Sequence, residues 1–193
     1  MGLTLTKGGN MSLTKAAGPA GLAKVTVGLG WDARTTDGSA FDLDSSAIVV
    51  GSNGRVVSDR HFVYFNQLDS GDGAVRHGGD NTTGEGAGDD EQIHLDLTAM
   101  PADTDKVVIA VSIYDADSRA QSFGQVRSAY ARVVDAATGA ELGRYDLTED
   151  AATETAMIFA EVYRNGAEWK FRAVGQGYST GLAGIARDFS VSV

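Results

Sequence analysis

The chain has 193 residues and is 42% hydrophobic, which is enough to bury the core of one ordinary domain. It carries 16 Lys and Arg against 26 Asp and Glu. The net charge of -10 argues against duplex nucleic acid or an anionic membrane surface as the main partner, and it favours a cationic one. Because the chain has no cysteine, disulfides, zinc–thiolate sites and thiol chemistry are excluded.

The start of the chain lacks the basic residues and apolar run of a signal peptide. No apolar stretch reaches the roughly 18 residues that a membrane-spanning helix needs. We therefore expect a cytoplasmic protein that does not insert into membranes. No linker-like segment or internal repeat divides the sequence, which favours a single domain over residues 1–193.

The predicted elements are mostly strands, because apolar and polar residues alternate between glycine-rich turns. The clearest run covers 23–31, where Val25, Val27 and Leu29 share one face. Further strands are expected over 41–49, 62–65, 93–97, 107–114, 130–134, 141–147, 157–163 and 169–173. Residues 107–111 are apolar on both faces, which is typical of a strand that is covered on both sides.

Helical periodicity is limited to 117–126 and 182–189. The chain is therefore predicted to be mainly β, a two-sheet β-sandwich with one or two short helices. The stretch 66–92 interrupts this regularity, because it is rich in glycine and almost without apolar side chains. A loop of this length inside a compact domain is usually functional or disordered.

That loop concentrates negative charge, with no Lys or Arg between 77 and 105, and its acidic residues are Asp80, Glu85, Asp89, Asp90 and Glu91. Two carboxylates about 7 Å apart repel by about 2 kcal/mol at an effective dielectric near 20. The group therefore needs a cation, protonation or wide separation in water. The alternating glycines allow turns that aim oxygens inward, and an oxygen-only ligand set indicates a hard cation, calcium before magnesium.

Two further acidic elements are candidate ligands. Strand alternation places Asp42 and Asp44 on the face opposite Phe41 and Leu43, and Asp115 directly follows an apolar strand. The amide and hydroxyl oxygens that could complete the roughly 6–8 ligands of calcium belong to Asn81, Thr82 and Thr83. A lone loop aspartate is usually solvated surface, but the clustering favours metal binding, in a site that lacks the EF-hand pattern.

Signals of catalysis are weak. The sequence contains no G-x-S-x-G motif and no P-loop, and the histidines at 61, 77 and 94 have no partners at metal or triad spacing. We therefore expect a protein that is not an enzyme. One alternative is a hydrolase that uses the same carboxylates on a catalytic metal for phosphoryl transfer, with Arg34, Arg55 and Arg60 as the nearby cations.

The other alternative is a binding module for a sugar or nucleotide that is bridged by calcium. Exposed aromatic side chains beside the acidic loop would favour this interpretation, and Trp31 and Tyr64 are the candidates if they are not buried.

Five sequence blocks follow one another along the chain: LTLTKGGN at 3–10, VGLGWD at 27–32, FDLDSS at 41–46, the loop 79–91, and IYDA at 113–116 followed by FGQV at 123–126. Together they resemble the tellurium-resistance TerD family of stress proteins over nearly the whole chain. The resemblance implies a β-sandwich that binds calcium through its acidic blocks, and a role in resistance to tellurite and other chemical stress. Matched residue by residue, it implies the ligands Asp42, Asp44, Asp80, Asn81, Thr83, Glu85, Asp89, Asp90, Glu91 and Asp115.

Physical chemistry limits what this resemblance can mean. Tellurite is an anion that an acidic site repels, and a chain without cysteine cannot reduce it with thiols, so direct detoxification is not expected. The hypothesis is that about two calcium ions pin the loop 66–92 against the strand of Asp42 and Asp44. The ordered acidic surface would then engage a protein partner or a membrane-associated complex.

Overall fold

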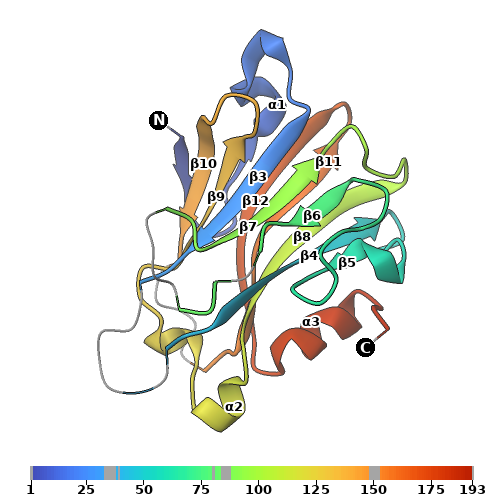
Figure 1. Cartoon of the computed structure of the whole chain (residues 1–193). Helices are drawn as coiled ribbons and strands as arrows, with labels where there is room; N and C mark the ends of the chain where they lie inside the picture. Colours follow the sequence, from blue (N-terminus) through green and yellow to red (C-terminus); the bar gives the residue numbers. More distant parts are fainter. Residues whose placement is uncertain are drawn as a thin grey trace.

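The computed structural model describes residues 2–32, 38, 40–79, 81–83, 88–147 and 153–192. In this part of the chain, strands form two six-stranded sheets that pack face to face, as Figure 1 shows. The predicted mainly-β, two-sheet sandwich is confirmed.

The first sheet, sheet A, has the order β1 (Leu3–Leu5), β10 (Glu141–Asp146), β9 (Tyr130–Asp135), β3 (Lys24–Gly30), β7 (Glu91–Asp96) and β6 (Val75–His77). The second, sheet B, has the order β2 (Asn10–Ser12), β12 (Glu168–Tyr178), β11 (Ala156–Asn165), β8 (Thr104–Ile113), β4 (Leu43–Gly51) and β5 (Phe62–Val63). The strand β1 runs parallel to β10, and the other neighbours in the two sheets are antiparallel.

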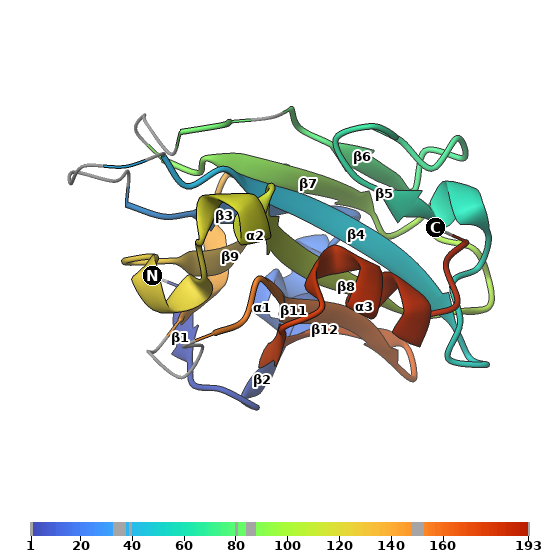
Figure 2. The ribbon, with the colours of Figure 1, turned by 90° about the horizontal axis from the view of Figure 1, so that it is seen from below.

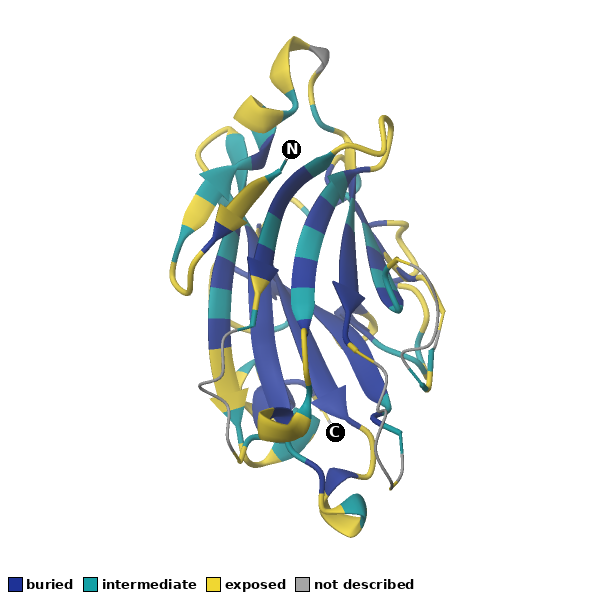
Figure 3. Ribbon diagram, turned by 90° about the vertical axis from the view of Figure 1, so that its left-hand side faces the viewer, coloured by how far each residue is buried: buried dark blue, intermediate teal, exposed yellow. Residues whose placement is uncertain are grey.

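The central strand β8 is covered on both faces, as its apolar run predicted. Val107, Ile109 and Val111 belong to the core between the sheets, whereas Val108 and Ala110 lie in a second cluster with residues of α3 (Gly181–Asp188). The helix α3 thus covers part of the outer face of sheet B (Figure 2). In β7, by contrast, buried residues alternate with half-buried ones (Figure 3), because only one face of this strand meets the core.

The described residues contain three short α-helices, one more than the largest number expected. Besides α3, these are α1 (Leu13–Ala16) and α2 (Ala116–Arg119). The helix α1 is only four residues long, and the Ser12 side chain caps it by accepting a hydrogen bond from Lys15 N at 3.1 Å. A helix of about one turn is too short to show helical periodicity in the sequence.

The prediction of one continuous loop over 66–92 is wrong, because strand β6 lies within it. Ala74 and Val75 are fully buried, and Val75 pairs with Leu95 of β7. A turn before β6 is held by Asp72, whose Oδ1 accepts hydrogen bonds from Ser70 Oγ at 2.5 Å and Ala74 N at 3.0 Å. Two buried apolar residues were too few to stand out from the surrounding glycines.

Across the described ranges, no helix is both long enough and apolar enough to cross a bilayer.

Candidate metal centre

The three acidic stretches meet at one end of the sandwich, where β4 begins and β8 ends (Figure 1). The link to the Asp115 stretch is a hydrogen bond from Tyr114 N to Asp42 O at 2.8 Å. The link to the acidic loop is a hydrogen bond from Ser45 N to Glu91 Oε2, also at 2.8 Å. Residues 42–45 therefore contact both of the other acidic stretches.

At the start of β4, Asp44 and its apolar neighbour Leu43 face opposite sides of sheet B. Phe41 and Leu43 are buried in the core between the sheets. By strand alternation, Asp44 shares the outer face of sheet B with Ile48, and it pairs with Ser112 of β8. Asp44 is only 7% exposed, so its carboxylate lies in a largely desolvated position.

Glu91 points the other way, into the space between the sheets. Its Oε2 accepts hydrogen bonds from Ser45 N and from Ser45 Oγ, the latter at 2.5 Å, and its Oε1 accepts one from Asn81 N at 3.1 Å. His77 Nε2 lies 3.3 Å from Oε2, and both of these side chains are 1% exposed. Because Gly79 N donates to His77 Nδ1 at 3.2 Å, the ring proton is assigned to Nε2, which faces the carboxylate.

Asp90 holds the start of β7 to the end of β3. Its Oδ2 accepts a hydrogen bond from Trp31 N at 2.9 Å, and its Oδ1 accepts one from Asn81 Nδ2 at 3.2 Å. Burial raises the pKa of Asp90, and the charges of Asp89, Glu91 and Asp32 raise it further, although the Trp31 hydrogen bond opposes them. The like charges of the neighbouring acids thus add to the effect of burial on this carboxyl.

Asp32 was not among the predicted ligands, although it acts on Asp90. It lies two residues after the end of β3, and its Oδ2 accepts a hydrogen bond from Ser128 Oγ at 2.7 Å. The sequence does place Asp32 near the end of a predicted strand. A single aspartate there does not predict a contact with a loop about sixty residues away, because that contact depends on how the strands pair.

The Asp89 side chain points away from Asp90 and Glu91 and lies on the outer face of sheet A. Its Oδ1 lies 2.7 Å from Arg132 Nε and its Oδ2 lies 3.0 Å from Arg132 Nη2. Tyr130 also donates its hydroxyl proton to Oδ1 at 3.0 Å. Burial raises the pKa of Tyr130 to about 12, and the charge of Asp89 adds to this shift. Both carboxylate oxygens of Asp89 are thus engaged by protein donors.

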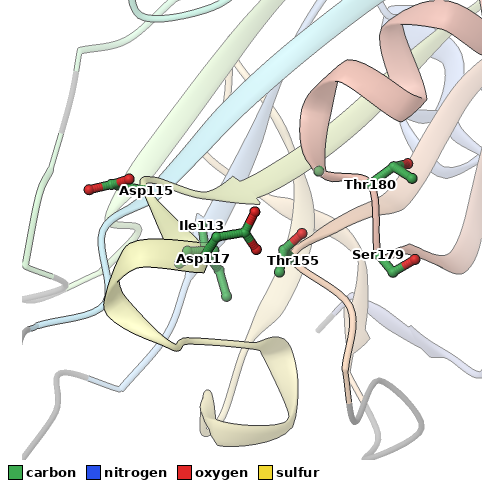
Figure 4. Close-up of a pocket in the computed structure, with 8 residues that line it drawn as sticks. Ile113, Asp115, Asp117, Thr155, Ser179 and Thr180 are labelled. Carbon is green, nitrogen blue, oxygen red and sulfur yellow. The ribbon is translucent and has the colours of Figure 1, made fainter.

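Asp115 has left-handed backbone angles, with φ 51° and ψ 37°, at the junction between β8 and α2. Its Oδ2 accepts a hydrogen bond from Ser118 Oγ at 2.5 Å. A neighbouring pocket of about 230 Å³ is lined by residues of β8, α2 and the start of α3. In Figure 4 the Asp117 side chain points toward Thr155 across this pocket, whereas that of Asp115 points away from it.

The remaining predicted ligands lie on the acidic loop. Asn81 Oδ1 accepts a hydrogen bond from Thr83 N at 3.2 Å, so these two residues form a local turn. Asp80 and Glu85 lie outside the described residues. Within the described ranges, no group of three or more Asp, Glu or His side chains is close enough to hold a metal ion. The ligand set therefore stays a prediction.

Two histidine clusters escaped the sequence reasoning. One is the buried group of His77 with Ser45 and Glu91. In the other, His61 Nδ1 lies 2.8 Å from Ser58 Oγ, and its Nε2 lies 2.8 Å from Asp72 Oδ2. Burial alone would raise the pKa of Asp72, but hydrogen bonds from Ser70, Ala74 N and His61 lower it below its ordinary value.

The aromatic residues give limited support to a small-ligand module. Trp31 is buried, with 6% of its surface exposed, so it offers no face to a ligand. Tyr64 is half-buried and stacks on Phe62 with ring centroids 4.7 Å apart.

The hydrolase alternative depends on three nearby arginines, of which Arg34 lies outside the described residues.

Known proteins with similar sequences and structures cover nearly all of the chain. The TerD domain model matches residues 1–189. The chain is 54% identical over 192 residues to tellurium resistance protein TerD of Serratia marcescens, covering 100% of this chain and 99% of that protein. It is 48% identical over 194 residues to general stress protein 16U of Bacillus subtilis, covering 100% of both.

A solved structure, of a homologue of telluride resistance protein TerD from Streptomyces coelicolor A3(2), superposes with a TM-score of 0.70 and 26% identity. The match covers 86% of this chain and 96% of that one. The resemblance carried by the five sequence blocks is confirmed: the chain belongs to the TerD domain family, whose relatives include tellurium-resistance and general stress proteins.

Proposed function

We propose that the chain is a calcium-binding module of the tellurite and chemical-stress response, and that it acts by engaging a partner rather than by catalysis. The meeting of three acidic stretches around residues 42–45 carries this proposal. Acids that gather from segments far apart in sequence repel one another, and a bound cation would relieve that repulsion.

The donor chemistry fits a hard cation. The side chains at this end supply carboxylate, amide and hydroxyl oxygens. Burial raises the pKa of Asp90, and the like charges of Asp89, Glu91 and Asp32 add to this shift. The residues predicted to hold calcium are Asp42, Asp44, Asp80, Asn81, Thr83, Glu85, Asp89, Asp90, Glu91 and Asp115, and Asp32 is added to them. Bound calcium would supply positive charge that links these stretches and stabilises one arrangement of the loop.

The charge of the site also limits the role in tellurite resistance. An acidic surface repels an oxyanion, so the module would protect the cell through another molecule. Neutralising the acids with about two calcium ions would create an ordered surface for a protein partner or a membrane-associated complex in the cytoplasm.

The decisive experiment is calorimetric titration of chelator-stripped protein with calcium, with magnesium as competitor. The double variant Asp42→Asn with Asp44→Asn should lose saturable binding. The matched control is Asp103→Asn with Asp105→Asn, two acids with the same spacing at the opposite end of β8. Absence of calcium binding by the unaltered protein, or equal binding by both double variants, would remove the proposal.

A further inference from the structure

Asp89, at the end of the acidic loop, forms a two-pronged contact with Arg132. Arg132 of β9 donates two hydrogen bonds to the two oxygens of Asp89, at 2.7 and 3.0 Å, and the Asp89 side chain is only 2% exposed. Two-pronged arginine–carboxylate pairs fix orientation as well as distance. The loop end is therefore held in a defined place on sheet A.

Residues from the three neighbouring strands β3, β9 and β7 surround the Asp89 carboxylate. Gly28 of β3 lies opposite Arg132 in the sheet, and a Cβ at position 28 would overlap the Asp89 carboxylate. Tyr130 donates one hydroxyl proton that Gly88 O, at 3.0 Å, and Asp89 Oδ1 can share, and Gln92 Nε2 lies 3.4 Å from Oδ2. A glycine is needed at 28 because the carboxylate occupies the space of a side chain.

Asp89 and Glu91 anchor the same segment from opposite sides of sheet A. Glu91 reaches Ser45 in the interior, whereas Asp89 lies on the outer face, since Gly28 alternates with the core residues Val27 and Leu29. Asp90 lies between the two anchors, and its Oδ2 accepts a hydrogen bond from Trp31 N.

We infer that Asp89 and Arg132 form a positioning pair that fixes the exit of the acidic loop, and that Asp89 is not itself a calcium ligand. This inference rests on the proposed calcium-binding function and assigns roles within it. The pair acts on calcium affinity through the placement of Asp90 and of Asn81, which is hydrogen-bonded to both Asp90 and Glu91.

The two possible roles of Arg132 predict opposite changes in calcium affinity when its side chain is replaced. Removing a positive charge near a cation site should tighten calcium binding if charge is all that matters. If Asp89 were a ligand, removing Arg132 would release its oxygens and again leave binding equal or tighter. A positioning role predicts weaker binding from the same substitution.

The experiment is a double-mutant cycle on the full chain with Asp89→Asn, Arg132→Gln and the double variant, titrated calorimetrically with calcium. Each single variant should bind about 10- to 100-fold more weakly, as supporting residues of metal sites typically do. The double variant should be no weaker than either single one, because both break the same contact. The matched control is Arg144→Gln, which removes a charge from the neighbouring strand, where Arg144 lies over the Tyr130 ring at 3.8 Å.

A second readout needs no metal. In calcium-free protein, amide hydrogen exchange over 88–92 should rise in Asp89→Asn and Arg132→Gln but not in Arg144→Gln. Unchanged or tighter calcium binding by Arg132→Gln, in protein whose unaltered form binds calcium, overturns the inference and leaves the proposed function standing. If the unaltered protein binds no calcium, the proposed function fails and the inference fails with it.

Discussion

Two buried carboxylates, one on each sheet, are held by arginine in different structural settings. On sheet B, Glu161 of β11 accepts hydrogen bonds from Lys106 Nζ at 2.7 Å and Arg172 Nε at 3.0 Å, which belong to the strands on either side. On sheet A, Asp89 comes from a loop and meets Arg132 of β9. The first pair joins strands that are already hydrogen-bonded together, whereas the second determines where a loop ends. Similar chemistry therefore joins strands in one place and fixes the end of a loop in the other.

The largest effect that separates these roles is expected from Glu161→Gln. The substitution leaves Lys106 and Arg172 without their carboxylate, and we expect a loss of about 2 kcal/mol in the free energy of unfolding, below the roughly 3–5 kcal/mol of a fully buried pair. The value is smaller because both cations are partly solvated. Urea denaturation measures the loss, and calcium affinity should not change. A marked change in calcium affinity would contradict a purely stabilising role for Glu161.

The pH dependence of stability should follow the same pair. Burial works to raise the pKa of Glu161, but Lys106 and Arg172 lower it below its ordinary value. The pair therefore stabilises the fold fully above the ordinary glutamate pKa of about 4.3, and this contribution is lost as pH falls through the lower folded pKa. The stability gap between the unaltered protein and Glu161→Gln should narrow in urea denaturation from pH 7 to pH 3. A gap that stays constant would mean that the Glu161 charge contributes nothing.

A steric change tests the loop anchor without removing any charge. In Gly28→Ala the new Cβ would displace the Asp89 carboxylate, so we expect a loss of about 1 kcal/mol in unfolding free energy together with weaker calcium binding. The control is Gly143→Ala on β10, where the added Cβ would meet the flexible Met11 side chain instead. Thermal unfolding and calcium titration measure the two effects. Equal calcium affinity in both variants would contradict the anchor.

The smallest effect is expected from Arg144→Gln. Arg144 pairs with Asp146 at 2.6 Å, but both side chains are about a third or more exposed, so the ion pair is screened. Stacking on Tyr130 adds a contribution typical of exposed cation–π contacts, and the total loss should stay within about 1 kcal/mol. Thermal unfolding measures the effect. If Arg144→Gln lowers the unfolding free energy as much as Glu161→Gln does, the exposure of an ion pair does not predict its contribution to stability in these sheets.

Much of the fold could be predicted from the longer strands, because at least one face of each meets the core. The period-two pattern of β3 and the double-sided apolar run of β8 both correspond to observed burial. The strand β6 was missed because its three residues become a strand only by pairing with β7. Tertiary contact, rather than local preference, decides such short elements.

The candidate site could be predicted only in outline. Charge imbalance identified the acidic loop, and strand alternation placed Asp44 opposite the core residue Leu43. The separate directions of the consecutive acids Asp89, Asp90 and Glu91 had no local signal. Each direction is determined by a partner on a different strand or strand end, so a sequence window that contains the acids does not contain their partners.

The sequence by itself determined the sandwich, the three acidic stretches and the membership of the TerD family, because strand periodicity, charge and motif order are properties of neighbouring residues. Only the tertiary structure decided which acids face the interior and which face outward. Ser45 lies 46 positions before Glu91, and Arg132 lies 43 positions after Asp89. Contacts over such separations form when whole sheets assemble, and it is then that each carboxylate acquires its donors and its role.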